Sequence, residues 1–448
     1  MHMKARIYLI ISICILVFGC NRIGKKHFIV SGTVNDMELS VAMLRTNDSI
    51  YVDTIENGKF LFTIPTSSEK YIDLKLGSII TLYVKPNDSV FVNYTDRYNY
   101  SLSGKGFEES ELLYKKEQLI KMLGFHDPRK IDIALFSSDT KVFKTKIDSI
   151  KQCRIKQIED FKGLHPNISD SFYKIEKELV DYFVINQLFL FPEFHKILTK
   201  SEADLSDDYY GFTKDIKPDR KELYSFHEYK SAINSLLKLQ TETMSEKYHL
   251  AKKLLTDRDF FEEMMYRDFR SYIRFHGIDN IDTLCVEFIN ELGDSKRKKI
   301  LKDKYDGWKR LAKGEEAPDF EIKDEKGSIV HLSDFKGKYV YIDCWNTHCG
   351  PCIAEMPAMK KLSDDLANKN IVFVSICSDR NTERWLSKLR EFDLNAVNLC
   401  TGGVRHDFFN DYNAKAFPRY ILIDDQGLII DATADKPSVI REELEKIK

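Results

Sequence analysis

The sequence predicts a multidomain α+β protein, with an antiparallel β unit first, an all-helical region next and an α/β unit last. Residues 27–106 consist of short β-branched and aromatic runs separated by turn residues, a pattern typical of antiparallel sheets. Residues 107–312 are charged, poor in glycine and carry apolar side chains at helical spacing. Residues 313–448 combine strand-like runs with helix-like segments. A chain of 448 residues has room for such separate folding units.

The β unit contains seven predicted strands separated by turn signals. An Asn-Gly pair at 57–58, a Gly-Ser pair at 77–78 and a Pro-Asn-Asp segment at 86–88 mark turns. This spacing predicts an antiparallel sandwich or barrel, and the absence of an ionisable cluster indicates a binding or spacer module. The predicted strands are residues 28–34, 41–44, 51–55, 59–64, 71–76, 79–84 and 89–94.

The middle region predicts helices whose aromatic side chains form a core. Phe261, Met265 and Phe269 recur at a spacing of four, which favours a buried helix face over a ligand site. The histidines of this region are scattered along it, so the sequence predicts no metal site. The predicted helices are residues 109–122, 145–161, 171–190, 228–244, 247–255, 260–275 and 294–311.

The last third places a Cys-x-x-Cys motif between a strand and a helix. Apolar residues 339–344 predict a buried strand, residues 353–367 a helix and residues 371–376 a parallel strand. Strand, helix and strand in this order imply a right-handed crossover and a sheet covered on both faces. Residues 437–446 predict a closing helix.

Cys349 and Cys352 are the predicted redox pair. The first cysteine of such a motif lies at a helix N-terminus, where unpaired N–H groups and the macrodipole favour a thiolate, so Cys349 is the predicted nucleophile. A structural zinc site would need a second ligand pair, and Cys377 and Cys400 are isolated in the sequence. A peroxiredoxin would need Thr or Ser where Asn346 stands. An inert disulfide remains an alternative, although so small a loop favours a labile bond.

Residues from about 314 to 448 resemble the thioredoxin-like reductases of the TlpA and ResA type, which are tethered outside the cytoplasm. The resemblance rests on Ala317-Pro318-Asp319-Phe320, on residues 332–338 and on the motif itself. It implies a thioredoxin fold and a redox-active Cys349–Cys352 disulfide that works without a cofactor. Protein disulfides are the implied substrates, and a membrane thiol electron donor is the implied source of electrons.

The resemblance also assigns roles around the motif. Phe417-Pro418 matches the point where a strand begins at a cis-proline, so Pro418 is expected to lie across from the sulfurs and Phe417 to contact substrate. Asp343 takes the position of thioredoxin's buried acid, and desolvation in an apolar strand should raise its pKa. It is expected to accept the proton of Cys352. Glu355 is expected to be a surface charge.

Four residues next to the cysteines complete the predicted substrate contacts. Gly350 and Pro351 are the pair that thioredoxin carries between its cysteines, which favours a reductant. Trp345 precedes the loop, and His348 replaces the aromatic residue usual before the first cysteine. A protonated imidazole at His348 would lower the pKa of the neighbouring thiol, although a solvated side chain there is the alternative.

The N-terminus predicts export and a lipid anchor. Lys4 and Arg6 precede an apolar run at residues 7–18, which is the length of a signal-peptide core, and residues 1–19 are predicted to be removed. Cys20 follows Gly19 as in a lipobox and is the predicted lipid anchor. An uncleaved anchor helix would tether the protein on the same side. The β unit resembles a domain of unknown role that precedes thioredoxin-like domains in many Gram-negative lipoproteins, which implies a periplasmic, lipid-anchored protein.

Charge and cysteine content narrow the function further. Lys plus Arg number 68 and Asp plus Glu number 70, so the chain has no basic field to bind nucleic acid. Cys344 is expected to be buried and inert, and Cys153 and Cys285 could bridge two helices. The sequence thus predicts a tethered periplasmic thiol-disulfide oxidoreductase that reduces exported proteins. The alternative is a cell-envelope binding or assembly lipoprotein in which the thioredoxin domain is secondary.

Overall fold

The computed structural model describes residues 26–36, 38–46, 49–96, 99–124 and 132–447. The chain divides into two compact units, and we describe each by itself. The first ends at Ile216 and takes in Glu222–Ser235, and the second holds Lys217–Lys221 and Leu236–Lys448. The predicted signal peptide and Cys20 lie outside the described residues. The division into segments 27–106, 107–312 and 313–448 stays a prediction.

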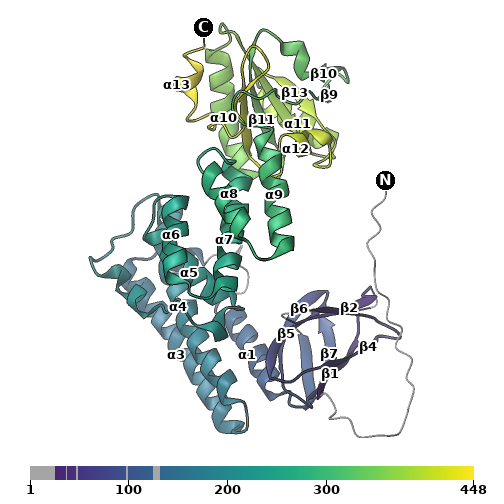
Figure 1. Cartoon of the computed structure of the whole chain (residues 1–448), viewed down its shortest axis with the longest axis vertical. Coiled ribbons are helices and arrows are strands. Elements are labelled where there is room, and N and C mark those ends of the chain that lie inside the picture. The colour runs from purple at the N-terminus through teal and green to yellow at the C-terminus, as the bar shows by residue number, and fades with distance from the viewer. Residues whose placement is uncertain (1–25, 37, 47–48, 97–98, 125–131, 448) are drawn as a thin grey trace. The chain divides into compact units, whose positions relative to one another are not determined.

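The first unit opens with a β-sandwich of two four-stranded sheets (Figure 1). Strand residues alternate between buried and exposed, as in β4, because every second side chain faces the core between the sheets. Phe28, Leu74 and Val90 are fully buried in that core. One sheet has the order β4-β1-β7-β8 and the other β3-β2-β5-β6. The strands are β1 His27–Val34, β2 Val41–Arg45, β3 Ile50–Thr54, β4 Lys59–Pro65, β5 Lys70–Leu76, β6 Ser78–Val84, β7 Ser89–Asp96 and β8 Asn99–Lys105.

Two features of the sandwich depart from the sequence prediction. β1 and β7 pair in parallel, whereas the other neighbouring strands pair antiparallel. β8 was not predicted, because its sequence is rich in small and polar residues and carries few apolar side chains. The pairing of β8 with β7, which begins with Ser89 opposite Lys105, forms it instead. Tertiary pairing therefore overrides weak local propensity here.

Gly32 lies at a point of the sandwich that leaves no room for a side chain. A Cβ at this position would stand 2.0 Å from the Val92 carbonyl oxygen and 2.8 Å from the Phe60 ring. We expect Gly32→Ala to lower the free energy of unfolding by about 3 kcal/mol, since strand β7 would have to move. Urea unfolding measures this. Gly163→Ala, which meets no atom within 4 Å, is the matched control and should not destabilise; equal loss in both variants would contradict the clash.

Helices follow the sandwich and continue into the second unit. Asp139 and Ser169 begin α3 and α4 by accepting hydrogen bonds from the N–H groups of Val142 and Phe172. The helices are α1 Glu108–Met122, α2 Ile133–Phe136, α3 Thr140–Leu164, α4 Asp170–Thr199, α5 His227–Leu239, α6 Met244–Leu254, α7 Arg258–His276, α8 Asp282–Glu291 and α9 Ser295–Lys309, with 3-10 turns at Tyr209–Asp215 and Lys221–Leu223.

The boundary between the helices predicted over residues 228–244 and 247–255 is wrong, since α5 ends at Leu239 and α6 begins at Met244. Thr243 and Glu246 form a capping box, in which the Thr243 side chain accepts from the Glu246 N–H and the Glu246 carboxylate accepts from Thr243 N–H. This box starts a new helix, α6, so α5 ends before it. α8 was not predicted, because its N-cap, Ile281, has no capping side chain.

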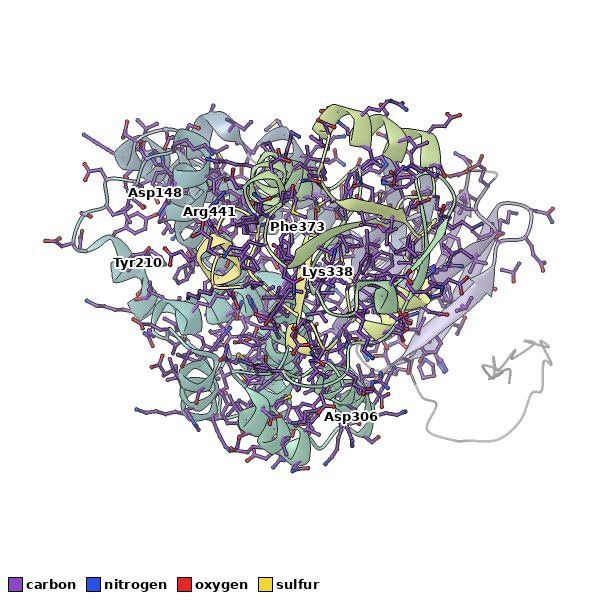
Figure 2. All side chains as sticks on the ribbon, turned by 90° about the horizontal axis from the view of Figure 1, so that it is seen from above. Asp148, Tyr210, Asp306, Lys338, Phe373 and Arg441 are labelled. Carbon is purple, nitrogen blue, oxygen red and sulfur yellow. A yellow bond between two sulfur atoms is a disulfide. The ribbon has the colours of Figure 1, made fainter. Side chains whose placement is uncertain are left out.

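The second unit carries a seven-stranded sheet of order β10-β9-β13-β12-β11-β14-β15 (Figure 1). β11, β12 and β13 are parallel neighbours, and β14 pairs antiparallel with β11. Phe373, labelled in Figure 2, belongs to a core that also holds residues of α10. The elements are β9 Glu321–Asp324, β10 Ile329–His331, β11 Tyr339–Trp345, α10 Gly350–Asp365, β12 Ile371–Cys377, α11 Thr382–Phe392, β13 Val397–Cys400, α12 Asp407–Asp411, β14 Arg419–Ile423, β15 Ile429–Asp431 and α13 Arg441–Leu444, with a 3-10 turn at Leu332–Phe335.

This arrangement confirms the fold class, since a sheet-rich start, a helical middle and a thioredoxin-like end are all present. The closing helix is shorter than the predicted 437–446, because Ile440, at its N-cap, supplies no capping side chain and turns precede it. Across the described ranges, no helix combines the length and apolar character needed to cross a bilayer.

Candidate active site

The Cys-x-x-Cys motif lies where β11 ends and α10 begins. Cys349 is the N-cap of α10, and its sulfur accepts a hydrogen bond from the Cys352 N–H at 3.2 Å. Pro351 lies in the first turn, where its missing N–H costs no helix hydrogen bond. The Cys349 N–H donates to the Asn346 carbonyl at 3.1 Å, which closes the loop before the helix. Helix dipole and free N–H groups therefore converge on one sulfur.

Cys349 and Cys352 form a disulfide, and the two sulfurs differ in exposure. Cys349 is half-buried, whereas Cys352 is 1% exposed and belongs to the core of the unit. A disulfide or thiolate from another protein can therefore meet Cys349 far more readily than Cys352. This asymmetry separates an attacking sulfur from a resolving one.

Asp343 is buried in β11, on the same strand face as Trp345, which packs in the core with Cys352. Its Oδ1 atom has no hydrogen-bond partner among the described residues. Loss of hydration, followed by the negative charge of Glu355, raises the pKa of Asp343 to about 8. The raised pKa predicted from the sequence is therefore confirmed, and the carboxyl can exchange a proton near neutral pH.

Glu355 does more than the expected surface charge. Lys436 Nζ lies 2.9 Å from its Oε1, and Ser438 donates both its N–H and its hydroxyl to the carboxylate at 3.1 Å. Burial alone would raise the pKa of Glu355, but the combined effect of Lys436 and Ser438 is larger and lowers it. These contacts hold the Glu355 carboxylate in place on α10, and its negative charge opposes ionisation of Asp343.

The Phe417-Pro418 peptide bond is cis, as the sequence predicted. β14 starts immediately after it and pairs antiparallel with β11, with Arg419 opposite Cys344. Pro418 is therefore at the sheet end where Trp345 leads into the cysteine loop. Phe417 packs against the same core as Cys349, which places it within the candidate site.

Arg419 is a positioning residue that sequence reasoning missed. Its guanidinium donates to the carbonyl oxygens of Arg274 and Phe275 at 2.5 and 3.0 Å, in the last turn of α7. It also lies over the Trp308 ring, 5.3 Å from the centroid. A buried cation next to Pro418 therefore caps a helix of the same unit and anchors the start of β14.

Arg419→Met should destabilise the second unit by about 2–3 kcal/mol, because two helix carbonyls lose a charged donor away from water. Thermal unfolding measures the loss. Arg441→Met is the matched control, since Arg441, labelled in Figure 2, pairs with Asp365 and Glu445 at the exposed surface. Its midpoint should stay nearly unchanged, and an equal fall in both variants would contradict the helix-capping role.

The remaining predicted contacts have defined partners. Trp345 is buried, and its ring N–H donates to the Ser375 hydroxyl at 2.8 Å, so its role is to hold β11 on β12. His348 is exposed, and the Arg384 guanidinium contacts its ring nitrogens. The Arg384 guanidinium therefore brings a positive charge next to His348. Gly350 is exposed.

The other described cysteines are free thiols. Cys344 is buried, and burial raises its pKa, as expected for an inert strand residue. The Cys153–Cys285 bridge is not formed: Cys153 is exposed, and burial raises the pKa of Cys285 to about 12. Among the residues placed by the structure, no cluster of three or more His, Cys, Asp or Glu side chains could hold a metal ion.

A dithiol held at a helix N-terminus on a thioredoxin fold exchanges electrons between thiol and disulfide, so the chain is a thioredoxin-like thiol-disulfide oxidoreductase. Residues 312–446 match the Redoxin family. The thioredoxin-like protein YneN of Bacillus subtilis is 34% identical over 123 residues, which span 27% of this chain and 71% of that protein. The thiol-disulfide oxidoreductase ResA of Bacillus thuringiensis is 31% identical over 134 residues, or 30% and 75% of the two chains. The chain belongs to the ResA-type family of thiol-disulfide oxidoreductases.

Two solved structures of similar sequence come from Bacteroides. The thioredoxin domain of a thiol-disulfide oxidoreductase from Bacteroides vulgatus is 31% identical, covers 30% of this chain and 97% of its own, and has a TM-score of 0.29. A thiol:disulfide interchange protein from Bacteroides sp. is 29% identical, covers 31% and 91% of the two chains, and has a TM-score of 0.29.

Proposed function

We propose that this protein is a membrane-tethered, periplasmic reductase of exported protein disulfides, with Cys349 as nucleophile and Cys352 as resolving thiol. The observation that carries the assignment is the difference in exposure between the two sulfurs. The reduced Cys349 thiolate attacks a substrate disulfide, forms a mixed disulfide and releases one substrate thiolate. Cys352 then attacks the Cys349 sulfur, its proton passes to Asp343, and the second substrate thiolate leaves.

Each cycle ends in the Cys349–Cys352 disulfide, so two electrons must be returned before the next one. A membrane thiol donor is the proposed source. Pro418 and Phe417 present backbone beside the sulfurs for an extended substrate chain, and Trp345, His348, Gly350 and Pro351 border the approach. The lipid anchor at Cys20 and removal of residues 1–19 remain part of the proposal.

Insulin reduction by the full chain tests the proposed chemistry. Thiol-dependent precipitation of the insulin B chain should be fast with wild type and fall to background with Cys349→Ser. A redox titration of the pair then separates a reductant from an oxidant. No thiol-dependent turnover by the wild type would favour a binding role instead.

Lipid attachment needs its own measurement in cells. Wild type should take up a radioactive fatty acid and sediment with membranes, whereas Cys20→Ser should lose the label. Retention of both label and membrane attachment by Cys20→Ser would refute acylation at this residue. The Cys153→Ser variant, altered at an exposed thiol away from the N-terminus, is the control.

The second candidate function is a binding or assembly lipoprotein, and a cavity in the first unit favours it. The cavity measures about 530 Å³ and is lined by Asp73, Lys116, Glu176 and His227 among others. Glu176 is 1% exposed and accepts from Tyr71 and Lys116 at 3.1 and 2.9 Å. A partner segment held there would give the sandwich and helices a recognition role alongside the dithiol.

A further inference from the structure

Cys377 and Cys400, isolated in the sequence, are neighbours in the sheet. Cys377 ends β12, Cys400 ends β13, and the two residues are register partners on these parallel strands. Neighbouring strands lie about 4.8 Å apart, which falls within the range of about 4.4–6.8 Å between Cα atoms that a disulfide spans. Paired residues of parallel strands point to the same face of the sheet. The backbone therefore holds two free thiols where a disulfide can form.

The pair lies at the active-site end of the sheet. Trp345, Cys377 and Cys400 follow one another across three adjacent strands, because Trp345 is the register partner of Cys377. Cys377 belongs to the core that holds Cys352, and Cys400 packs against that core from a half-buried position. Both dithiols therefore face the same core.

Asp379 orients both thiols and reaches the active-site loop. The Cys377 Sγ atom lies 3.4 Å from its Oδ2 atom, and the Cys400 Sγ atom lies 3.4 Å from its carbonyl oxygen. The same Oδ2 accepts from the Thr347 N–H at 2.7 Å, two residues before Cys349. One residue thus fixes the second pair and the loop that carries the first.

We propose that Cys377 and Cys400 form a second thiol-disulfide site, in which Cys400 attacks a low-molecular-weight disulfide and Cys377 resolves the adduct. Nothing in the reductase cycle described above requires this pair, so the proposal goes beyond the proposed function. Cys400 is half-buried and Cys377 is fully buried, which repeats the asymmetry of the active-site pair. Hydrogen bonding from the Cys377 thiol lowers the pKa of Cys400, and the Gly402 N–H assists.

The reaction balances without another reactant. The Cys400 thiolate attacks one sulfur of the small disulfide, so a protein–small-thiol disulfide forms and one small thiolate leaves. Cys377 then attacks the Cys400 sulfur, its proton goes to the second departing thiolate, and the Cys377–Cys400 bond forms. Two protein thiols are oxidised, and one small disulfide is reduced to two thiols.

The test uses the full chain with Cys349→Ser and Cys352→Ser, so that the active-site pair takes no part. The protein is equilibrated in glutathione buffers from fully reduced to fully oxidised, free thiols are blocked with N-ethylmaleimide, and digested peptides are identified by mass spectrometry. We expect a Cys377–Cys400 linked peptide to become the main form under oxidising buffer and to vanish with excess dithiothreitol. If Cys377 and Cys400 are each found blocked by N-ethylmaleimide in every glutathione buffer, with no linked peptide, the proposal is overturned.

A second variant tests the order of attack. With Cys377→Ser added, Cys400 should hold glutathione as a stable adduct, because the resolving thiol is gone. With Cys400→Ser instead, adduct at the buried Cys377 should be at least tenfold less. Equal adduct at both positions would overturn the assigned roles. Since the active-site cysteines are absent throughout, failure here is distinguishable from failure of the reductase cycle.

Discussion

Cys352→Ser should convert the enzyme into a trap that holds its substrate covalently. Cys349 remains half-buried at the N-terminus of α10, so its thiolate can still attack a substrate disulfide. The mixed disulfide then persists, because the sulfur that would displace the substrate is absent. Multiple turnover should fall to the uncatalysed rate, while one equivalent of substrate becomes bound.

Mass spectrometry of the intact protein under non-reducing conditions measures this adduct after incubation with a peptide disulfide. Cys349→Ser is the matched control and should form no adduct at the motif, since Cys352 is 1% exposed. Equal adduct formation by both variants would contradict the assignment of an outer and an inner sulfur. Peptide mapping must place the adduct on Cys349, because Cys400 is also half-buried.

Asp343→Asn should make the protein more stable at alkaline pH. The pKa of Asp343 is raised to about 8 in the folded state, against 3.8 for an ordinary aspartate. The folded state therefore binds one more proton than the unfolded state between about pH 4 and pH 8, and stability falls as the pH rises through that window. The penalty approaches about 6 kcal/mol above pH 8, since the pKa rises from 3.8 to about 8 and each pKa unit corresponds to about 1.4 kcal/mol.

Urea unfolding at a series of pH values measures this effect. At pH 3 the carboxyl is neutral in both the folded and the unfolded state, so Asp343→Asn should match wild type, and at pH 9 the variant should be more stable by several kcal/mol. Asp411→Asn, at an exposed residue of α12, is the control and should follow wild type. Parallel curves for wild type and Asp343→Asn would contradict a neutral buried carboxyl.

The same variant tests the proton transfer. If Asp343 accepts the proton of Cys352, resolution of a preformed mixed disulfide on Cys349 should slow about 100-fold in Asp343→Asn near pH 8. Stopped-flow release of a fluorescent thiol follows this step. An unchanged rate would show that a group other than Asp343 accepts the proton of Cys352. The prediction for stability does not depend on this outcome.

The local sequence pattern was sufficient to predict those elements whose signals lie in adjacent residues. The apolar run of β11, the Cys-x-x-Cys motif at the start of α10 and the cis bond before Pro418 all follow from adjacent residues. Strong periodicity likewise predicted α1 and α7, whose ends differ from expectation by one or two residues. Where the local signal was weak, as in β8 and α8, prediction failed.

Helix boundaries within the middle region show why prediction was incomplete. The apolar period of residues 228–244 runs past the end of α5 at Leu239, and the hydrogen bonds of the capping box at Thr243 start α6 earlier than predicted. The parallel contact of β1 with β7 joins segments separated by the whole sandwich sequence. Such pairing depends on the closure of the core, which no local window of sequence contains.

By itself the sequence determined the chemistry: two thiols at a strand-to-helix junction, an acid in the preceding strand and a cis-proline. Tertiary structure decided what surrounds them. It placed Arg419 under the last turn of α7, and it brought Cys377 beside Cys400. The physical reason is that the residues of the motif are close together in the sequence and can be recognised there. The contacts of Arg419 and of the Cys377–Cys400 pair form only when sheet register and helix packing bring residues that are distant in the sequence close together.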